Sequence, residues 1–282
     1  MTPKGKLIAI GGAEDKGTDK DLFAVNKNNP NYIELGILKR IVAEAGGKQS
    51  HIEVITTASM IPGEVGRNYL SAFTKAGCGN VNHMRIRKTK DAENEELLER
   101  LRTCDAVMFS GGNQSKLTSV FGGTQFLEIL KERYAKEKFI IAGTSAGAMA
   151  MSKIMIADGQ AAHAHLKGVV KISTGLWFID GIIIDSHVNK RGRFIRMSKA
   201  IALSTLQIGV GLGEDTGVVI TNGNELEVIG SGIVFIIDGK GIRHNNVPLI
   251  KEGETIAMEN LNVHILEKGN RYHAVERKFT KN

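Results

Sequence analysis

The sequence predicts an α/β protein with three layers, in which a mostly parallel sheet lies between two layers of helices and a β-rich part follows. Two observations support this prediction. Through the first half of the chain, short apolar runs alternate with stretches whose apolar residues recur about every 3.6 positions. After Trp177 the pattern changes, and from Ile208 the chain becomes mainly strand-like. Because no repeat or linker interrupts the pattern, residues 1–282 are expected to form a single domain.

The first half contains five predicted strands rich in Val, Ile and Phe, separated by four amphipathic helices. The strands are expected at 7–10, 51–55, 81–86, 106–109 and 139–142, and the helices at 32–45, 66–76, 94–102 and 125–136. In such sheets ligands bind at the carboxyl ends of the strands. The polar and glycine-rich segments that follow these strands are therefore the first places to look for a site.

The second half begins with a predicted strand at 181–185 and a helix at 191–206, and strands dominate after that. Asn222-Gly223 is typical of a hairpin turn between two of them. The remaining strands are expected at 208–213, 218–221, 226–229, 233–237, 263–266 and 272–275.

Composition narrows the class of protein. The net charge of +7 does not indicate a nucleic-acid partner, because Lys and Arg are interleaved with acids and no aromatic-basic motif accompanies them. No apolar run approaches the roughly 20 residues that span a membrane, and the N-terminal apolar run is too short for a signal peptide. Cys78 and Cys104 lack metal-ligand spacing and are expected to be buried thiols. We therefore expect a cytoplasmic protein.

The segment Gly143-Thr-Ser-Ala-Gly147 has the pattern of a nucleophile elbow. It follows an apolar strand and precedes a small-residue helical pattern, so Ser145 would sit in a sharp turn with its hydroxyl exposed at a strand end. Glycines on both sides let the strand and helix backbones approach closely. The alternative is an ordinary turn in which Ser145 only caps the helix. The strand and helix contexts favour the nucleophile.

A nucleophilic serine needs a base and an acid that orients it. His187 follows a buried strand, as Ser145 does, and is the best placed of the eight histidines, although it also fits a structural role at a strand end. Glu214 follows the predicted strand at 208–213 and is the preferred acid, with Asp185 and Asp215 as competitors. The order Ser, His, acid differs from that of the α/β-hydrolases.

Backbone N–H groups of Gly112 and Ala146 are expected to bind the oxyanion, and the Gln114 amide is expected to hold substrate. A simple turn at 110–114 is the alternative. No metal or organic cofactor is expected: His163 and His165 resemble half a metal site, but no third ligand is evident.

Arg191, Arg193 and Arg196 lie where a helix begins, although cations are favoured at the other end of a helix. This placement indicates a role in binding carboxylates, for which arginine offers two parallel hydrogen bonds. A solvated basic face is the alternative.

Five segments occur in the order seen in the cyanophycinase family of serine peptidases, which is related to aspartyl dipeptidase, and the chain resembles this family over nearly its whole length. The segments are Gly11-Gly-Ala-Glu-Asp-Lys16, Ser110-Gly-Gly-Asn-Gln114, Gly143-Thr-Ser-Ala-Gly-Ala148, Asp185-Ser-His-Val-Asn-Lys-Arg-Gly-Arg-Phe-Ile-Arg196 and Gly211-Leu-Gly-Glu-Asp-Thr216.

The resemblance implies an intracellular homodimer with a fold akin to class I glutamine amidotransferases. It implies hydrolysis of cyanophycin, a poly-aspartate with arginine on its side-chain carboxyls, to β-Asp-Arg dipeptides. Ser145 would be the nucleophile, His187 the base and Glu214 the orienting acid. The substrate-binding positions implied are Gln114, Asp185, Arg191, Arg193 and Arg196.

The chain departs from the family pattern near the predicted pocket. Ser186 and Val188 flank His187 where the family usually has Gln and Phe, Gly217 stands where alanine is common, and Phe194-Ile195 replaces a sequence that often contains glycine. Two other functions therefore stay open: a dipeptidase or isoaspartyl peptidase acting on short Asp-X substrates, and a non-catalytic binder of small molecules or peptides. A glutamine amidotransferase is disfavoured because its elbow carries cysteine.

Overall fold

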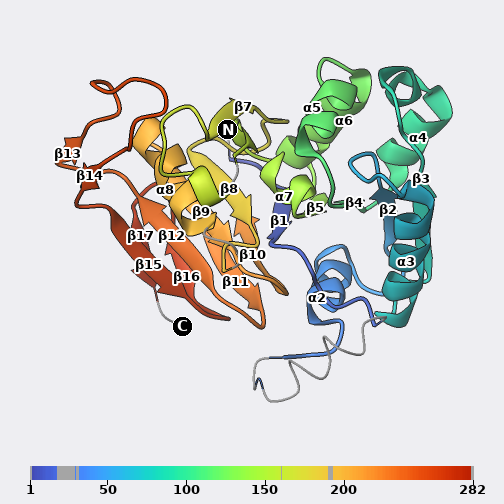
Figure 1. Ribbon diagram of the computed structural model, residues 1–282. Coiled ribbons are helices and arrows are strands. Elements are labelled where there is room, and N and C mark those ends of the chain that lie inside the picture. Colours follow the sequence, from blue (N-terminus) through green and yellow to red (C-terminus); the bar gives the residue numbers. More distant parts are fainter. Residues whose placement is uncertain (1, 18–28, 30–31, 160, 190–192, 281–282) are drawn as a thin grey trace.

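The computed structural model describes residues 2–17, 29, 32–159, 161–189 and 193–280. Its main sheet has the strand order β17-β16-β11-β10-β1-β5-β4-β2-β3 (Figure 1). One half of this sheet is parallel: β1 (Lys6–Ile10), β5 (Ile140–Thr144), β4 (Ala106–Phe109), β2 (His51–Ile55) and β3 (Asn80–Met84). The other half is antiparallel and adds β10 (Thr216–Thr221), β11 (Glu225–Gly230), β16 (Arg271–His273) and β17 (Lys278–Thr280).

Helices cover both faces of the parallel half, as the three-layer prediction requires. Successive strand residues point to opposite faces, so Leu7 and Ala9 of β1 pack in one core while Ile8 and Ile10 pack in another. The second core includes residues of α2 (Gly36–Glu44) and α3 (Pro62–Lys75). The first core includes residues of α4 (Glu95–Thr103), α5 (Gln114–Phe121), α6 (Gln125–Lys136) and α7 (Ala146–Met149). The short helix η1 (Thr89–Glu93) contacts the first three of these.

A second sheet, with the order β15-β12-β9-β8, lies at the end of the molecule where the C-terminal strands gather (Figure 1). Its strands are β8 (Ile182–Ser186), β9 (Ile208–Leu212), β12 (Val234–Asp238) and β15 (Asn262–Leu266), and α8 (Arg193–Leu203) packs on it. Gly209 lets α8 approach, because a Cβ there would lie 2.8 Å from the Met197 sulfur. The shorter elements are η2 (Ala161–His163), the pair β6 (Ile154–Asp158) and β7 (Lys171–Thr174), and the pair β13 (His244–Asn245) and β14 (Met258–Glu259).

The predicted α/β class is confirmed, with local differences. The bounds of β2, β4 and α6 agree with the sequence prediction. The helix expected at 32–45 begins only at Gly36, whereas α3 begins four residues earlier than expected because Pro62 suits the first turn of a helix. Helix α5 and the β6–β7 hairpin were not predicted. The predicted hairpin turn is confirmed, with positive φ at Asn222 and Gly223.

Two other expectations concern the burial of the cysteines and the length of apolar helices. Cys78 and Cys104 are free and buried, as predicted. Among the described residues, no helix combines the length and the apolar character needed to cross a bilayer.

Candidate active site

Ser145 lies in the sharp turn between β5 and α7, with φ of 50° and ψ of −111°, a conformation that side chains rarely adopt. Its neighbours make the turn possible. A Cβ at Gly143 would lie 2.6 Å from the Gly147 carbonyl carbon, and a Cβ at Gly147 would lie 2.8 Å from the Phe109 Cβ. The two glycines therefore allow β5, α7 and β4 to meet behind Ser145, as the elbow prediction requires.

The structure brings His187 and Glu214 to Ser145. The Nε2 atom of His187 lies 3.3 Å from the Ser145 Oγ, and its Nδ1 lies 3.0 Å from the Glu214 Oε1. The His187 and Glu214 side chains keep 25% and 20% exposure, so solvent and substrate can reach them. The three groups form a line in which a carboxylate orients an imidazole whose other nitrogen faces a hydroxyl, the arrangement that activates a serine.

The two other candidate acids, Asp215 and Asp185, have partners other than His187. Asp215 is buried and accepts a hydrogen bond from the Ser231 hydroxyl, and the Asp15 N–H donates to it at 3.3 Å. Burial raises the pKa of Asp215. Asp185 is paired with Arg196, whose Nε lies 2.9 Å from the Asp185 Oδ2. Of the three candidates, Glu214 is the acid in contact with His187.

Gly11 and Gly12 hold these segments together, a role that the sequence analysis did not assign. The Gly11 carbonyl accepts the His187 N–H at 3.0 Å, and the Gly12 carbonyl accepts the Asp215 N–H at 3.0 Å. Just before them, the Ile10 carbonyl accepts the Ser145 N–H at 2.9 Å. A Cβ on Gly12, whose φ is 104°, would overlap the His187 ring. In the sequence, the feature that could have indicated this role is the pair of consecutive glycines directly after the first predicted strand.

The glycine segment predicted to supply an oxyanion donor lies beside Ser145. A Cβ on Gly111 would lie 3.3 Å from the Ser145 Cβ. Gly112 has a φ of 140°, and a Cβ there would lie 2.2 Å from the Ala58 carbonyl oxygen. Ala146 is the first residue of α7, where a helix leaves N–H groups without intrahelical acceptors. The structure thus brings Gly111 close to Ser145, which Ala146 directly follows, while the roles of Gly112 and Ala146 in binding an oxyanion stay predictions.

Ser186 places a second hydroxyl beside that of Ser145. Its Oγ lies 3.4 Å from the Ser145 Oγ, and its side chain is buried. The Arg193 guanidinium donates to the Ser186 carbonyl at 2.9 Å, which places one predicted arginine beside the site. Arg191 lies outside the described residues.

Other residues predicted to bind substrate already have partners in the protein. Arg196 makes a two-pronged ion pair with Asp185, and both are buried. The Gln114 amide donates to the Ile156 and Ala157 carbonyls at 3.0 and 2.9 Å. These contacts link α5 and α8 to the segments around Ser145, and the substrate contacts stay predictions.

A buried carboxylate lies behind the elbow. Glu14 accepts hydrogen bonds from the hydroxyls of Thr144, at 2.7 Å, and Tyr69, and Lys16 lies 2.9 Å from it. Burial alone would raise the pKa of Glu14, but the Lys16 ammonium and the two hydroxyls hold that pKa below its usual value. Glu14 is therefore ionised in the folded protein at neutral pH.

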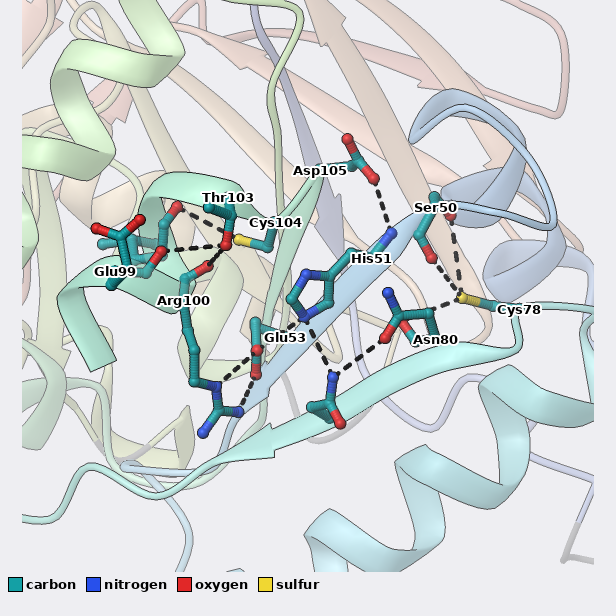
Figure 2. A network of polar contacts seen from close by, with 12 residues as sticks. Ser50, His51, Glu53, Cys78, Asn80, Glu99, Arg100, Thr103, Cys104 and Asp105 are labelled. Carbon is teal, nitrogen blue, oxygen red and sulfur yellow. Dashed lines mark hydrogen bonds and ion pairs between the residues drawn. The ribbon is translucent and has the colours of Figure 1, made fainter. Parts of the chain in front are cut away.

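A separate polar network lies at the amino ends of β2 and β4, the opposite edge of the sheet from Ser145 (Figure 2). Its centre is the buried Glu53, which binds the Arg100 guanidinium through both oxygens and also contacts His51 Nε2 at 2.9 Å. The His51 N–H donates to Asp105 at 2.7 Å. This network ties α4 to the sheet. Within the part of the chain that the structure describes, no three His, Cys, Asp or Glu side chains cluster as metal ligands.

The sequence matches the model of peptidase family S51 over residues 27–229. The chain belongs to this peptidase family. Curated relatives of this S51 peptidase include the cyanophycinase of Trichormus variabilis, 32% identical over 97% of this chain and 87% of that protein. The cyanophycinase of Geminocystis herdmanii is 31% identical over 96% of this chain and 94% of its own length. The family and the name its relatives share place the chain among the serine peptidases.

Solved structures agree on the fold of this S51 peptidase. A peptidase from an acI-B1 Actinobacterium superposes with a TM-score of 0.68 at 19% identity, covering 96% of this chain and 98% of that one. A putative peptidase E from Listeria monocytogenes EGD-e gives 0.51 at 18% identity, covering 80% of this chain and 98% of that one. At these identities the likeness concerns the fold.

Proposed function

We propose that this S51 peptidase hydrolyses cyanophycin to β-Asp-Arg dipeptides, with Ser145, His187 and Glu214 as its catalytic triad. One observation carries the proposal: the line of contacts from the Glu214 carboxylate through the His187 ring to the Ser145 hydroxyl, with separations of 3.0 and 3.3 Å. The curated relatives that share 31–33% identity over almost the whole chain are cyanophycinases, which supports the substrate.

The chemistry follows from these positions. Ser145 Oγ attacks the scissile carbonyl while His187 Nε2 takes its proton, and Glu214 stabilises the imidazolium that forms. The oxyanion binds the backbone N–H groups of Gly112 and Ala146. His187 then protonates the leaving amine, which departs and leaves an acyl ester on Ser145. Water, deprotonated by His187, releases the acid product and regenerates the hydroxyl.

The substrate offers free carboxylates and guanidinium groups, so the pocket needs charged and polar partners. Arg193 beside Ser186 is our choice for a carboxylate, because arginine binds carboxylates with two parallel hydrogen bonds. The Gln114 amide nitrogen is engaged by β6, so its carbonyl oxygen is the atom to accept a substrate N–H. Asp185 and Arg196, which pair with each other, contribute chiefly by holding the pocket wall.

We also propose the finer properties that the family resemblance implies. These are a fold akin to class I glutamine amidotransferases, a homodimeric assembly and a cytoplasmic location. The elbow between β5 and α7 at the carboxyl edge of a parallel sheet supports the first of them.

The test is dipeptide release from purified cyanophycin, followed by mass spectrometry. Wild-type protein and Ser71→Ala, a change at an exposed serine of α3, should release β-Asp-Arg, and Ser145→Ala should not. The same proteins are assayed on short Asp-X dipeptides. Release of dipeptide by Ser145→Ala would contradict the nucleophile, and cleavage of dipeptides without cleavage of the polymer would favour the dipeptidase.

A further inference from the structure

Glu14 is a charged group that the proposed chemistry does not use. Its carboxylate is buried, with 3% exposure, in the segment that follows β1, beyond the point where β1 and β5 end side by side. Burying a charge is costly unless partners compensate it. The protein supplies three: the Thr144 hydroxyl on one oxygen, and the Tyr69 hydroxyl and Lys16 ammonium on the other. Such a complete set of partners fixes the position of the carboxylate.

One of these partners adjoins the nucleophile. Thr144 directly precedes Ser145 and lies opposite Ile10 in the β1–β5 register. The Thr144 hydroxyl donates to Glu14 at 2.7 Å, and the Ser145 N–H donates to the Ile10 carbonyl at 2.9 Å. The segment that leads into the elbow is therefore bound to β1 and its continuation at two successive residues, once through a side chain and once through the backbone.

The elbow needs such restraint. Backbone conformations as rare as that of Ser145 are unfavourable and persist only when the surroundings impose them. Gly143 and Gly147 make room for the turn, but removing a Cβ only permits a conformation and does not enforce it. A hydrogen bond from the preceding side chain to a charged, buried acceptor is a strong restraint.

We infer that Glu14 is a positioning residue for the nucleophile, acting through the Thr144 hydroxyl to hold Ser145 in line with His187. The inference rests on the proposed role of Ser145. A residue that only stabilises the fold would, when changed, lower the free energy of unfolding. Loss of the Glu14–Thr144 contact should in addition lower the reactivity of Ser145 in the protein that stays folded.

The test measures the rate constant for labelling of Ser145 by a fluorophosphonate, together with kcat and KM on cyanophycin. Thr144→Val removes the hydroxyl at nearly constant shape, Thr144→Ser keeps it, and Glu14→Gln removes the acceptor charge. Thr124→Val is the matched control. Thr124 is also buried, and its hydroxyl also donates at 2.7 Å, but it caps α6 on the outer layer. Thermal unfolding of each variant reports stability.

Thr144→Val and Glu14→Gln should lower the labelling rate and kcat about tenfold or more, with KM within about twofold, because a misplaced nucleophile affects the transition state and not substrate binding. Thr144→Ser should retain most of the rate, and Thr124→Val should lose stability alone. A Thr144→Val protein that is labelled as fast as wild type would overturn the inference and leave the triad standing. An unlabelled wild type would overturn both.

Discussion

Ser145 and His187 lie 42 residues apart in the chain, yet their side chains are 3.3 Å apart because both backbones bind the end of the same strand. The Ser145 N–H donates to the Ile10 carbonyl, and the His187 N–H donates to the carbonyl of the next residue, Gly11. The end of β1 thus fixes the positions of Ser145 and His187, the proposed nucleophile and base, relative to each other.

Gly12→Ala should lower kcat about a hundredfold or more, because the added methyl would overlap the His187 ring and push it away from Ser145. Gly46→Ala is the control. Gly46 has a similar φ of 115°, against 104° at Gly12, but no heavy atom of the described residues lies within 4 Å of the place of its Cβ. Both variants should lose about 1–2 kcal/mol of stability from the backbone conformation. Equal hydrolysis rates in the two would show that Gly12 does not place His187.

Glu214→Gln should lower kcat by about 10²–10⁴, because an amide cannot stabilise the imidazolium and favours the wrong tautomer of His187. Asp215→Asn, one residue along, should keep kcat within about threefold, because Asp215 contacts Ser231 and not His187. Steady-state hydrolysis by the two variants decides between the acids. A larger loss of kcat in Asp215→Asn than in Glu214→Gln would identify Asp215 as the acid that orients His187.

The Glu14 carboxylate should make stability depend on pH. Because its pKa in the folded protein is lowered, its ionised form contributes stability above the unfolded pKa of about 4.3, and this contribution is lost as the pH falls through the folded value. Glu14→Gln should therefore be clearly less stable than wild type near pH 7, and the gap should narrow below about pH 4. Thermal unfolding at both pH values measures the gap.

The contribution of Asp215 to stability should change with pH in the opposite direction to that of Glu14. Burial raises its pKa, so its contribution is present at low pH and is lost as the pH rises through the folded value. The stability of Asp215→Asn relative to wild type should improve as the pH rises. A gap for Glu14→Gln that stays constant with pH would show that folding does not shift the pKa of Glu14. A gap that narrows as the pH rises would show that the folded protein keeps Glu14 protonated.

The Asp185–Arg196 pair should behave as a structural ion pair. Arg196→Met leaves a buried carboxylate without its partner and should cost about 3–5 kcal/mol of unfolding free energy. Combining it with Asp185→Leu should recover part of that loss, since no lone charge remains. Urea unfolding gives the three free energies. A single variant as stable as wild type would instead favour a pair that opens easily to bind substrate.

The elements that position the candidate site could be predicted because a short stretch of sequence indicates each of them. An apolar strand that runs into Gly-x-Ser-x-Gly specifies the elbow at Ser145, and the polar residue after a buried strand indicated His187. Helix α5 was missed although Asn113 caps it and Leu117, Val120 and Phe121 form its buried face, because its eight residues contain few strong helix formers.

Polar contacts between residues far apart in the chain could not be predicted from the sequence. The carboxylate of Glu14 meets a hydroxyl 130 residues away, and the charges of Asp185 and Arg196 neutralise each other instead of facing solvent. Which acid meets which base depends on tertiary packing, and spacing along the chain does not encode it. In the antiparallel half of the main sheet, β10, β11 and β16 were predicted as strands, whereas β17 and the order of the strands were not. The pairing of short strands is set by register and contact.

The most direct measurement is fluorophosphonate labelling with the modified residue mapped by mass spectrometry, while hydrolysis of cyanophycin is followed on the same samples. We expect a single label on Ser145, loss of hydrolysis in proportion to labelling, and no label in Ser145→Ala. Hydrolysis that persists in fully labelled protein, or a label on another residue that abolishes hydrolysis, would show that Ser145 is not the nucleophile.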